Sequence, residues 1–271
     1  MVQILGLSNI YRILLNKFSI FIKRFSPNLL NAFIKTNTKR ISDPVSGSKI
    51  KVDLYQYFNF KYLWLSPTWL RSHRRYFSKK ARGFGEAPFH AAWLYILKTY
   101  KPKYLLEIGV YRGQVISLWQ LISDKCGLDV EISGITPLTN EGDEVSKYLE
   151  IDYKNDILKN FKKFKLKKPI LFEGLSTDGY VIDFMCSKKW DLIYIDGGHN
   201  FNVALSDYHN SVSNLNRGGI LCIDDSSLYL DITINGKFRG HPGPSKVVSE
   251  YANKELDYLM TVGHNNFFIK R

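Results

Sequence analysis

The chain has 271 residues, a formal net charge of +13 at pH 7 and a hydrophobic content of 45%, enough for a sizeable core. No stretch reaches the roughly 18 uncharged apolar residues of a membrane span, and the amino end lacks the cleavage site of a signal peptide. The three cysteines, Cys126, Cys186 and Cys222, are an odd number without metal-type spacing. The sequence therefore argues against a membrane-spanning or exported protein and predicts a cytoplasmic one.

The positive charge gathers near the amino end. Residues 1–85 hold 16 lysines and arginines against two acidic residues, Asp43 and Asp53, a net charge of +14, whereas the remainder carries −1. We therefore expect two parts, a basic, aromatic-rich extension over residues 1–85 and a main domain over residues 86–271.

Within the extension, residues 4–25 (ILGLSNIYRILLNKFSIFIKRF) predict a helix that is too apolar for water and too basic for complete burial. Two interpretations remain open. The helix either covers the main domain or a second subunit in a homo-oligomer, or lies on an anionic membrane surface at the inner membrane face. Residues 69–82 (WLRSHRRYFSKKAR) form a second basic stretch, which either attracts phosphate groups or is simply a solvated face.

From about residue 88 the chain alternates strand-like and helix-like stretches, which predicts a parallel sheet with helices on both faces. The expected strands are residues 104–109, 130–136, 169–174, 191–196 and 218–225. Apolar residues at three- and four-residue spacing predict helices over residues 89–100, 114–123, 155–164, 179–188 and 202–215. Residues 256–271 predict a closing antiparallel hairpin around GHNN. The expected fold is a doubly wound, Rossmann-like α/β domain with a basic, helical amino-terminal extension.

The junction of the first strand and its helix, LLEIGVYRGQ at residues 105–114, places Glu107, Gly109 and Gly113 where ligands bind in such sheets. Glycines there allow a tight turn and a close approach of the ligand to the main chain. A dinucleotide site would have a glycine where Glu107 stands, and the carboxylate would repel a pyrophosphate. The junction therefore favours a cationic ligand over a nicotinamide cofactor.

The pattern E-x-G-x-x-x-G of residues 107–113 resembles the first motif of class I S-adenosylmethionine-dependent methyltransferases. The resemblance implies that residues 86–271 are a methyltransferase domain with S-adenosylmethionine as its cofactor. The implied cofactor contacts in this loop are Glu107, Gly109, Tyr111, Gly113 and Gln114.

Two further loops depart from that family's pattern or leave alternatives open. The family usually has an acid for the ribose hydroxyls after the second strand, where this chain has Thr136. A longer loop could supply the acid instead, from Glu141, Asp143 or Glu144. After the third strand, Ser176, Thr177 and Asp178 stand at a helix start, where they could cap the helix or border the adenine.

Acidic residues end the fourth and fifth strands. Asp196 follows the fourth strand, with His199 three residues later, and the doublet Asp224 and Asp225 ends the fifth. Neighbouring strand ends lie about 5 Å apart, so these carboxylates would converge and repel one another. A hard divalent cation such as Mg²⁺ would remove that conflict.

The motifs D-G-x-H and D-D resemble the metal-dependent O-methyltransferases, in particular the sugar and natural-product branch that includes macrocin O-methyltransferase-like and cephalosporin-hydroxylase-like proteins. The resemblance implies that Asp196, Asp224 and Asp225 are Mg²⁺ ligands and that the metal holds a diol. It also implies that His199 is the general base and that Asp196 has a catalytic and a cofactor-binding role. The alternatives are a structural histidine and acids that only cap loops.

The acceptor is expected to be a small molecule or a glycan, phosphorylated or lipid-linked because of the basic amino-terminal segment. Arg239 and His241, in FRGHPGPSKVVSEY, are candidate substrate contacts unless that loop is a plain connection. A nucleic-acid methyltransferase would also use the basic segment. However, the fourth strand is followed by DGGH, not by a tetrapeptide similar to the D-P-P-Y or N-P-P-Y of enzymes that methylate bases. A non-catalytic binding module is the other alternative.

Overall fold

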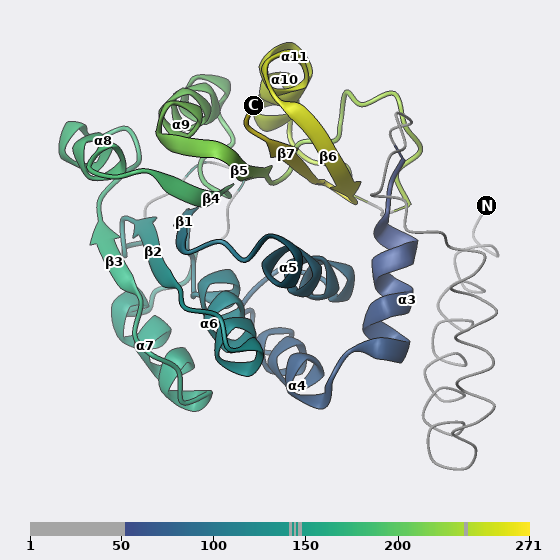
Figure 1. The fold of residues 1–271 in the computed structure, drawn as a ribbon. Coiled ribbons are helices and arrows are strands. Elements are labelled where there is room, and N and C mark those ends of the chain that lie inside the picture. Colours follow the sequence, from purple (N-terminus) through teal and green to yellow (C-terminus); the bar gives the residue numbers. More distant parts are fainter. Residues whose placement is uncertain (1–51, 141–142, 144, 146–147, 236–237) are drawn as a thin grey trace.

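The computed structural model describes residues 52–140, 143, 145, 148–235 and 238–271. Its centre is a seven-stranded sheet in the order β3-β2-β1-β4-β5-β7-β6 (Figure 1). The strands are β1 Tyr104–Ile108, β2 Glu131–Thr136, β3 Ile170–Glu173, β4 Trp190–Ile195, β5 Leu215–Ile223, β6 Asp257–Val262 and β7 Asn265–Ile269. Strands β1 to β5 pair in parallel, and β7 is antiparallel to both β5 and β6. The predicted fold class is confirmed, and β5 starts three residues before the predicted strand.

Helices cover both faces of the sheet (Figure 1). One face carries α3 Tyr55–Leu65, α4 Thr68–Phe77, α5 Ala87–Tyr100, α6 Gln114–Cys126 and α7 Tyr153–Lys163. The other carries α8 Gly179–Cys186, α9 Phe201–Asn214 and α10 Pro242–Val247, which continues through a π-helical turn, Val248–Ala252, into α11 Asn253–Glu255. In the described part of the chain, no helix is long and apolar enough to cross a membrane.

Alternation along each strand divides the core into two layers. In β1, Leu105 packs with the helices α3 to α7, whereas Leu106 and Ile108 pack with the helices on the opposite face. All three are buried, because a parallel sheet between two helical layers has no solvated face. This arrangement leaves the carboxyl ends of the parallel strands as the edge where polar side chains can gather.

The described end of the basic extension shares this core. Phe58 of α3 and Leu70 of α4 are fully buried in the cluster that includes α5 and α6. The Leu54 N–H donates to the Thr261 carbonyl oxygen at 2.8 Å, which ties the segment before α3 to β6. Residues 52–85 are therefore packed together with the main domain. The predicted helix over residues 4–25 lies outside the described residues.

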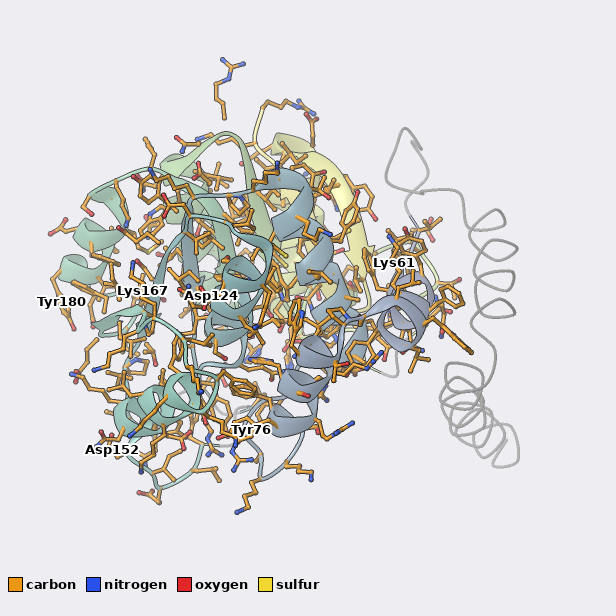
Figure 2. The ribbon with its side chains drawn as sticks, turned by 60° about the horizontal axis from the view of Figure 1, so that its bottom comes forward. Lys61, Tyr76, Asp124, Asp152, Lys167 and Tyr180 are labelled. Atoms are coloured by element: carbon orange, nitrogen blue, oxygen red, sulfur yellow. The ribbon has the colours of Figure 1, made fainter. Side chains whose placement is uncertain are left out.

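The basic stretch at residues 69–82, most of which is helix α4, has one buried side and one exposed side. His73 and Phe77 are buried, whereas Arg75 and Lys79 are exposed. Tyr76 reaches α7, where its hydroxyl donates to Asn160 Oδ1 at 2.7 Å, and Figure 2 shows this side of the molecule. The apolar side of the helix thus explains its packing, and the basic side faces water.

A buried chain of polar groups joins α4, α5 and α6. His73 Nε2 lies 3.0 Å from Ser117 Oγ, His73 Nδ1 lies 3.1 Å from His90 Nε2, and His90 Nδ1 lies 3.1 Å from the Glu86 carbonyl oxygen. Because a carbonyl only accepts, His90 Nδ1 carries the proton. In a neutral chain His73 Nδ1–H then donates to His90, and the Ser117 hydroxyl has two acceptors within reach, His73 Nε2 and the Gln114 carbonyl oxygen. Burial lowers the pKa of both histidines, that of His90 to about 3, which keeps the chain neutral.

Candidate active site

A cavity of about 840 Å³ opens at the carboxyl ends of β1, β2, β4 and β5. Its size is that of sites for cofactors and small molecules. Of the predicted site residues, those that line it are Glu107, Gly109, Tyr111, Gln114, Thr136, Ser176, Asp196, His199, Asp224, Asp225 and His241. Gly113, Asp178 and Arg239 are not part of its wall. The sheet therefore gathers most of the predicted residues in one place, although they come from loops far apart in the sequence.

The glycine loop after β1 is pressed against the loop after β4. Gly109 has a φ of +92°, and a Cβ there would lie 1.9 Å from the Asp196 carbonyl oxygen, so only glycine fits. Gly113 has a φ of +78° and is the N-cap of α6, behind the cavity wall. The close approach at Gly109 places the loop between β1 and α6 next to Asp196.

Glu107 presents a buried carboxyl group to the cavity. It accepts a hydrogen bond from the Ile116 N–H of α6 at 3.3 Å. Burial raises the pKa of Glu107 well above its ordinary value, and the nearby Asp224 raises it further. A cationic ligand in the cavity would favour the ionised form. The group therefore suits the positively charged end of a ligand.

The structure places some of the predicted ribose contacts after β2 at the cavity and others elsewhere. Thr136 lines the cavity, and its hydroxyl accepts from the Leu138 N–H at 3.3 Å. Of the acids in the following loop, Glu141 and Glu144 lie outside the described residues, and Asp143 is bonded to His199. Thr136 is thus the polar side chain that β2 itself presents to the cavity.

The loop before α8 differs from the predicted cap. Ser176 and Thr177 line the cavity. Asp178 stands at the N-cap, but its carboxylate accepts from the Leu175 N–H at 2.9 Å and makes no capping bond to a backbone N–H of the helix. Asp178 therefore shapes the loop, because its short side chain bonds backward along the chain.

Three carboxyl groups meet at the ends of β4 and β5. Burial raises the pKa of Asp196 well above its ordinary value, and the neighbouring Asp224, Asp225 and Glu107 raise it further. Burial and Asp225 likewise raise the pKa of Asp224, whose Oδ1 is buried without a hydrogen-bond partner. The predicted convergence of these acids is therefore present, together with the repulsion that it implies.

Asp225 is held in an unusual backbone conformation. Its φ is +50°, a left-handed value that costs energy for a residue other than glycine. The His241 N–H donates to its carbonyl oxygen at 2.7 Å, and the adjacent Gly240 has no room for a Cβ beside that carbonyl. The loop before α10 thereby fixes the direction of the Asp225 side chain.

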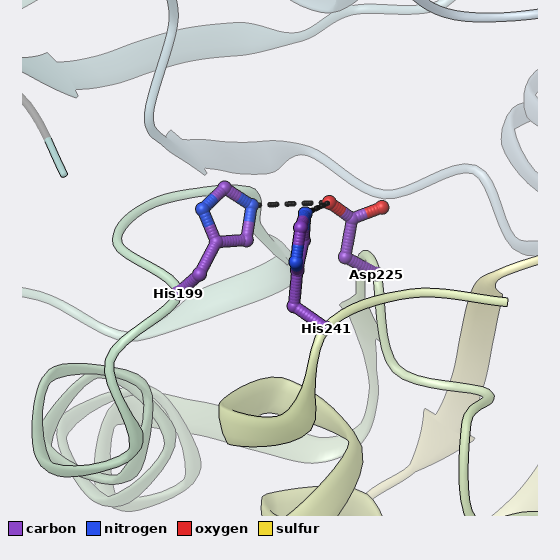
Figure 3. A group of neighbouring side chains, drawn as sticks. All are labelled: His199, Asp225 and His241. Carbon is purple, nitrogen blue, oxygen red and sulfur yellow. Dashed lines mark hydrogen bonds and ion pairs between the residues drawn. The ribbon is translucent and has the colours of Figure 1, made fainter. Parts of the chain in front are cut away.

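His199 lies between two carboxylates. Its Nδ1 is 2.5 Å from Asp143 Oδ2, which also accepts from the His199 backbone N–H at 2.7 Å. Its Nε2 is 3.0 Å from Asp225 Oδ2, and His241 Nε2 lies 3.7 Å from the same oxygen (Figure 3). Burial alone would lower the pKa of His199, but the hydrogen bonds to Asp225 and Asp143 outweigh it and raise the pKa. His199 is therefore oriented by a carboxylate at each ring nitrogen.

Arg239 does not face the cavity. Its Nη2 donates to the carbonyl oxygens of Ser227 and Leu230, at 3.2 and 2.9 Å, and so holds its own loop together. The predicted substrate contact at Arg239 is thus replaced by an internal one, whereas His241 lies in the cavity wall. The sequence pattern did not separate the two because both follow the same strand.

Two residues of the site have roles that the sequence pattern does not predict. The pattern offers Asp143 only for the ribose, but its contact with His199 joins loops 56 positions apart. His264 belongs to the predicted turn GHNN, and its Nε2 lies 3.4 Å from Asp224 Oδ1. The signal available for His264 was its position at the tip of the closing hairpin, next to the end of β5.

The donors present fit a divalent cation. Among the described residues, two sets of three ligand atoms lie within 4.8 Å of one another, namely His199, Asp225 and His241, and Asp224, Asp225 and His264. Asp196 belongs to neither set, although Asp224 is close enough to raise its pKa. The unpartnered oxygen of Asp224 and the repulsion among the acids are what a bound cation would relieve.

Comparison with known proteins agrees with this geometry. Residues 106–226 match a family model described as a methyltransferase domain. They include the glycine loop, both acidic strand ends and His199. A search of curated proteins finds no significant match.

Solved structures share the fold at low identity. A putative caffeoyl-CoA O-methyltransferase from Staphylococcus aureus is 15% identical, with a TM-score of 0.55 over 80% of this chain and 99% of its own. An O-methyltransferase from Bacillus cereus in complex with S-adenosylhomocysteine (SAH) is 13% identical, with a TM-score of 0.53 over 80% and 97%. The SAH-bound methyltransferase PaMTH1 from Podospora anserina is 16% identical, with a TM-score of 0.52 over 76% and 89%.

Residues 106–226, a little under half of the chain, are thus similar to a methyltransferase domain, and solved methyltransferases share the fold. The matched segment runs from within β1 to just past the end of β5.

Proposed function

We propose that the protein transfers the methyl group of S-adenosylmethionine to a hydroxyl oxygen of a small-molecule or glycan acceptor, with a divalent cation and a histidine base. The observation that carries the proposal is the position of His199, which a carboxylate orients at Nδ1 beside the acids that end β4 and β5. Neither a plain strand-to-helix turn nor a nucleotide-binding module requires this arrangement.

The cofactor binds along the first strand and its glycine loop. Glu107 faces its cationic amino-acid part, and Gly109, Tyr111 and Gln114 line the same stretch of the cavity. Thr136 is placed for the ribose and Ser176 for the adenine. SAH-bound structures of the same fold support this placement by analogy.

Asp224 and Asp225 would hold the cation, with Asp196 beside them. A cation bound there would supply Lewis-acid chemistry toward the oxygens of an acceptor diol and would make the reacting hydroxyl more acidic. The chain's own part is to supply the carboxylates, and the left-handed backbone at Asp225 sets the direction of one of them.

His199 takes the proton of the acceptor. Without a cation, both ring nitrogens face carboxylates, which favours the protonated ring. With Asp225 turned to a cation, Asp143 would keep the proton on Nδ1 and leave the Nε2 lone pair to the acceptor. The acceptor O–H gives its proton to Nε2, an oxygen lone pair forms the new bond to the methyl carbon, and the electrons of the breaking carbon–sulfur bond go to sulfur. A base of this kind contributes roughly 10²- to 10⁴-fold, and alignment contributes up to about 7 to 11 kcal/mol.

The wall of the cavity favours an acceptor whose reacting end carries no phosphate. Among the described residues no lysine or arginine lines it, whereas six carboxyl groups do, those of Glu86, Glu107, Asp143, Asp196, Asp224 and Asp225. Any phosphate or lipid-linked part of the acceptor would therefore lie outside the cavity. Peripheral membrane contact, oligomer formation and a cytoplasmic location stay predictions.

Calorimetric titration with S-adenosylmethionine and transfer of its labelled methyl group to catechol, hexoses and amino sugars test the proposal. We expect the cofactor to bind, and transfer to require a divalent cation and to stop with a chelator. His199→Gln should lower kcat/KM at least about 100-fold, as loss of a general base does. His209→Gln, at an exposed histidine of α9, is the matched control and should leave it unchanged.

Absence of cofactor binding would contradict the methyl donor in this proposal. Methyl transfer that survives the chelator would contradict the cation. Unchanged kcat/KM in His199→Gln would remove the base.

A further inference from the structure

His264 lies beside the acids because of the topology of the closing hairpin. Strand β7 runs antiparallel to β5, with Asn266 paired to Ile223, so the turn between β6 and β7 lies at the carboxyl end of β5. The Ser226 N–H donates to the His264 carbonyl oxygen at 3.0 Å and fixes the turn there. The only residues between Ile223 and Ser226 are the two aspartates, so the histidine stands directly against the doublet.

The imidazole is directed by aromatic rings. Its ring centroid lies 4.8 Å from that of Phe89 and 5.2 Å from that of Phe238, in edge-on contacts. With these rings beside it, His264 Nε2 lies 3.4 Å from Asp224 Oδ1 and 3.7 Å from Asp225 Oδ1. Both distances are longer than a good N–H···O hydrogen bond of about 2.7 to 3.2 Å.

These three atoms therefore surround a point without being bonded to one another. Asp224 Oδ1 is buried and has no hydrogen-bond partner, which is costly unless something else satisfies it. A cation between the two carboxylate oxygens and the imidazole nitrogen would satisfy all three donors.

We propose that His264 is a ligand of the same divalent cation as Asp224 and Asp225, and that its nitrogen makes the site prefer a first-row transition ion such as Mn²⁺ to Mg²⁺. This inference rests on the proposed metal dependence of the enzyme. Imidazole is a good ligand for transition ions, whereas Mg²⁺ is bound almost entirely by oxygen. The Mg²⁺ expected from the acids alone is thus replaced by a mixed nitrogen and oxygen site.

The other candidate histidines are placed less well for this role. His199 and His241 face the Oδ2 atom of one carboxylate, that of Asp225, whereas His264 faces an oxygen from each of two. His199 Nδ1 is also bonded to Asp143, which orients it for the proton transfer described above.

Binding of Mn²⁺ to the full chain, followed by electron paramagnetic resonance, tests the inference without measuring activity. We expect the wild-type protein to bind Mn²⁺ in competition with Mg²⁺ and to show a coupling between the bound ion and an imidazole ¹⁴N nucleus. His264→Gln should remove that coupling and weaken Mn²⁺ binding at least about tenfold, because even partners of metal ligands cost 10- to 100-fold. His209→Gln is again the matched control and should change neither.

Other results would contradict the role of His264 or the metal site as a whole. Bound Mn²⁺ without ¹⁴N coupling, coupling that persists in His264→Gln, or tighter binding of Mg²⁺ than of Mn²⁺ would overturn the role of His264 and leave the metal-dependent reaction in place. A wild-type protein that binds neither ion would overturn both. The coupling in the wild-type protein is measured without any variant, so poor folding of His264→Gln would not obscure the result.

Discussion

Two buried polar clusters in this protein have opposite characters. In the cluster of His73, His90 and Ser117, both histidines are neutral and every ring nitrogen has a partner. In the cluster of Asp196 and Asp224, with Asp225 beside them, three carboxyl groups are crowded together and Asp224 Oδ1 has no hydrogen bond. Satisfied polar groups strengthen the packing of the elements that carry them, whereas unsatisfied ones weaken it. The difference indicates that the first cluster serves the fold and the second serves a ligand.

Asp225→Asn should have the largest effect and tests the second cluster. Asparagine keeps the shape and tolerates a left-handed backbone, but it removes the charge that would hold the proposed cation. We expect kcat/KM to fall roughly 10³-fold, the order seen when an electrostatic stabiliser is removed from an active site, with cofactor affinity nearly unchanged. Enzyme assays and calorimetry with S-adenosylmethionine measure the two quantities, and retained turnover would show that this acid has no part in catalysis.

His73→Ala breaks the first cluster. It removes a fully buried ring and leaves His90 Nε2 without its partner, while the Ser117 hydroxyl keeps only the Gln114 carbonyl oxygen. The free energy of unfolding should fall by about 2 to 4 kcal/mol, from lost packing and unsatisfied polar atoms. Urea denaturation measures the change, with His209→Ala as the exposed control. A loss below that of the control would mean that the cluster does not support the fold.

Acidification should affect the two clusters in opposite directions. The unfolded histidines take up protons near pH 6.5, whereas folded His90 does so only near 3, so this cluster loses stability as the pH falls through that window. Each fully buried histidine costs up to about 1.4 kcal/mol per pH unit. The raised pKa of Asp196 has the reverse sign, because the folded acid holds its proton while the unfolded one has lost it, and that contribution is lost as the pH rises.

The free energy of unfolding of the wild type, His90→Phe and Asp196→Asn, measured between about pH 7 and about pH 5, separates the contribution of the histidines from that of Asp196. The first variant should flatten the loss of stability on acidification, and the second should raise the stability of the metal-free protein near pH 7. Identical pH profiles for the wild type and His90→Phe would contradict the neutral histidine chain.

The sequence predicted the parts of the site that follow from strand order. Asp196, Asp224 and Asp225 come directly after apolar runs, and parallel strands must end at one edge, so their convergence could be expected. The bond between Asp143 and His199 could not, because it depends on the path of the long loop after β2. The position of His264 depends on the register of β7 on β5, which no local pattern specifies.

The limits of the basic extension show a similar division. Composition changes near residue 85, where the basic excess ends and the regular alternation begins. Packing does not change there, because Phe58 and Leu70 already belong to the core. Composition mainly reflects the charge of the exposed surface. The burial of individual apolar side chains in α3 and α4 depends instead on how these helices pack on α5 and α6.

The contact at Gly109 makes two loops into one rigid unit. The cofactor loop cannot move toward β4 without displacing the carbonyl of Asp196, because the space between them does not admit even a methyl group. A substitution at position 109 would therefore damage donor and acceptor binding together. If the proposed function holds, the distance between the methyl group and its acceptor is set by the backbone, and the loops after β5 could change the shape of the acceptor pocket without altering the alignment of the reacting atoms.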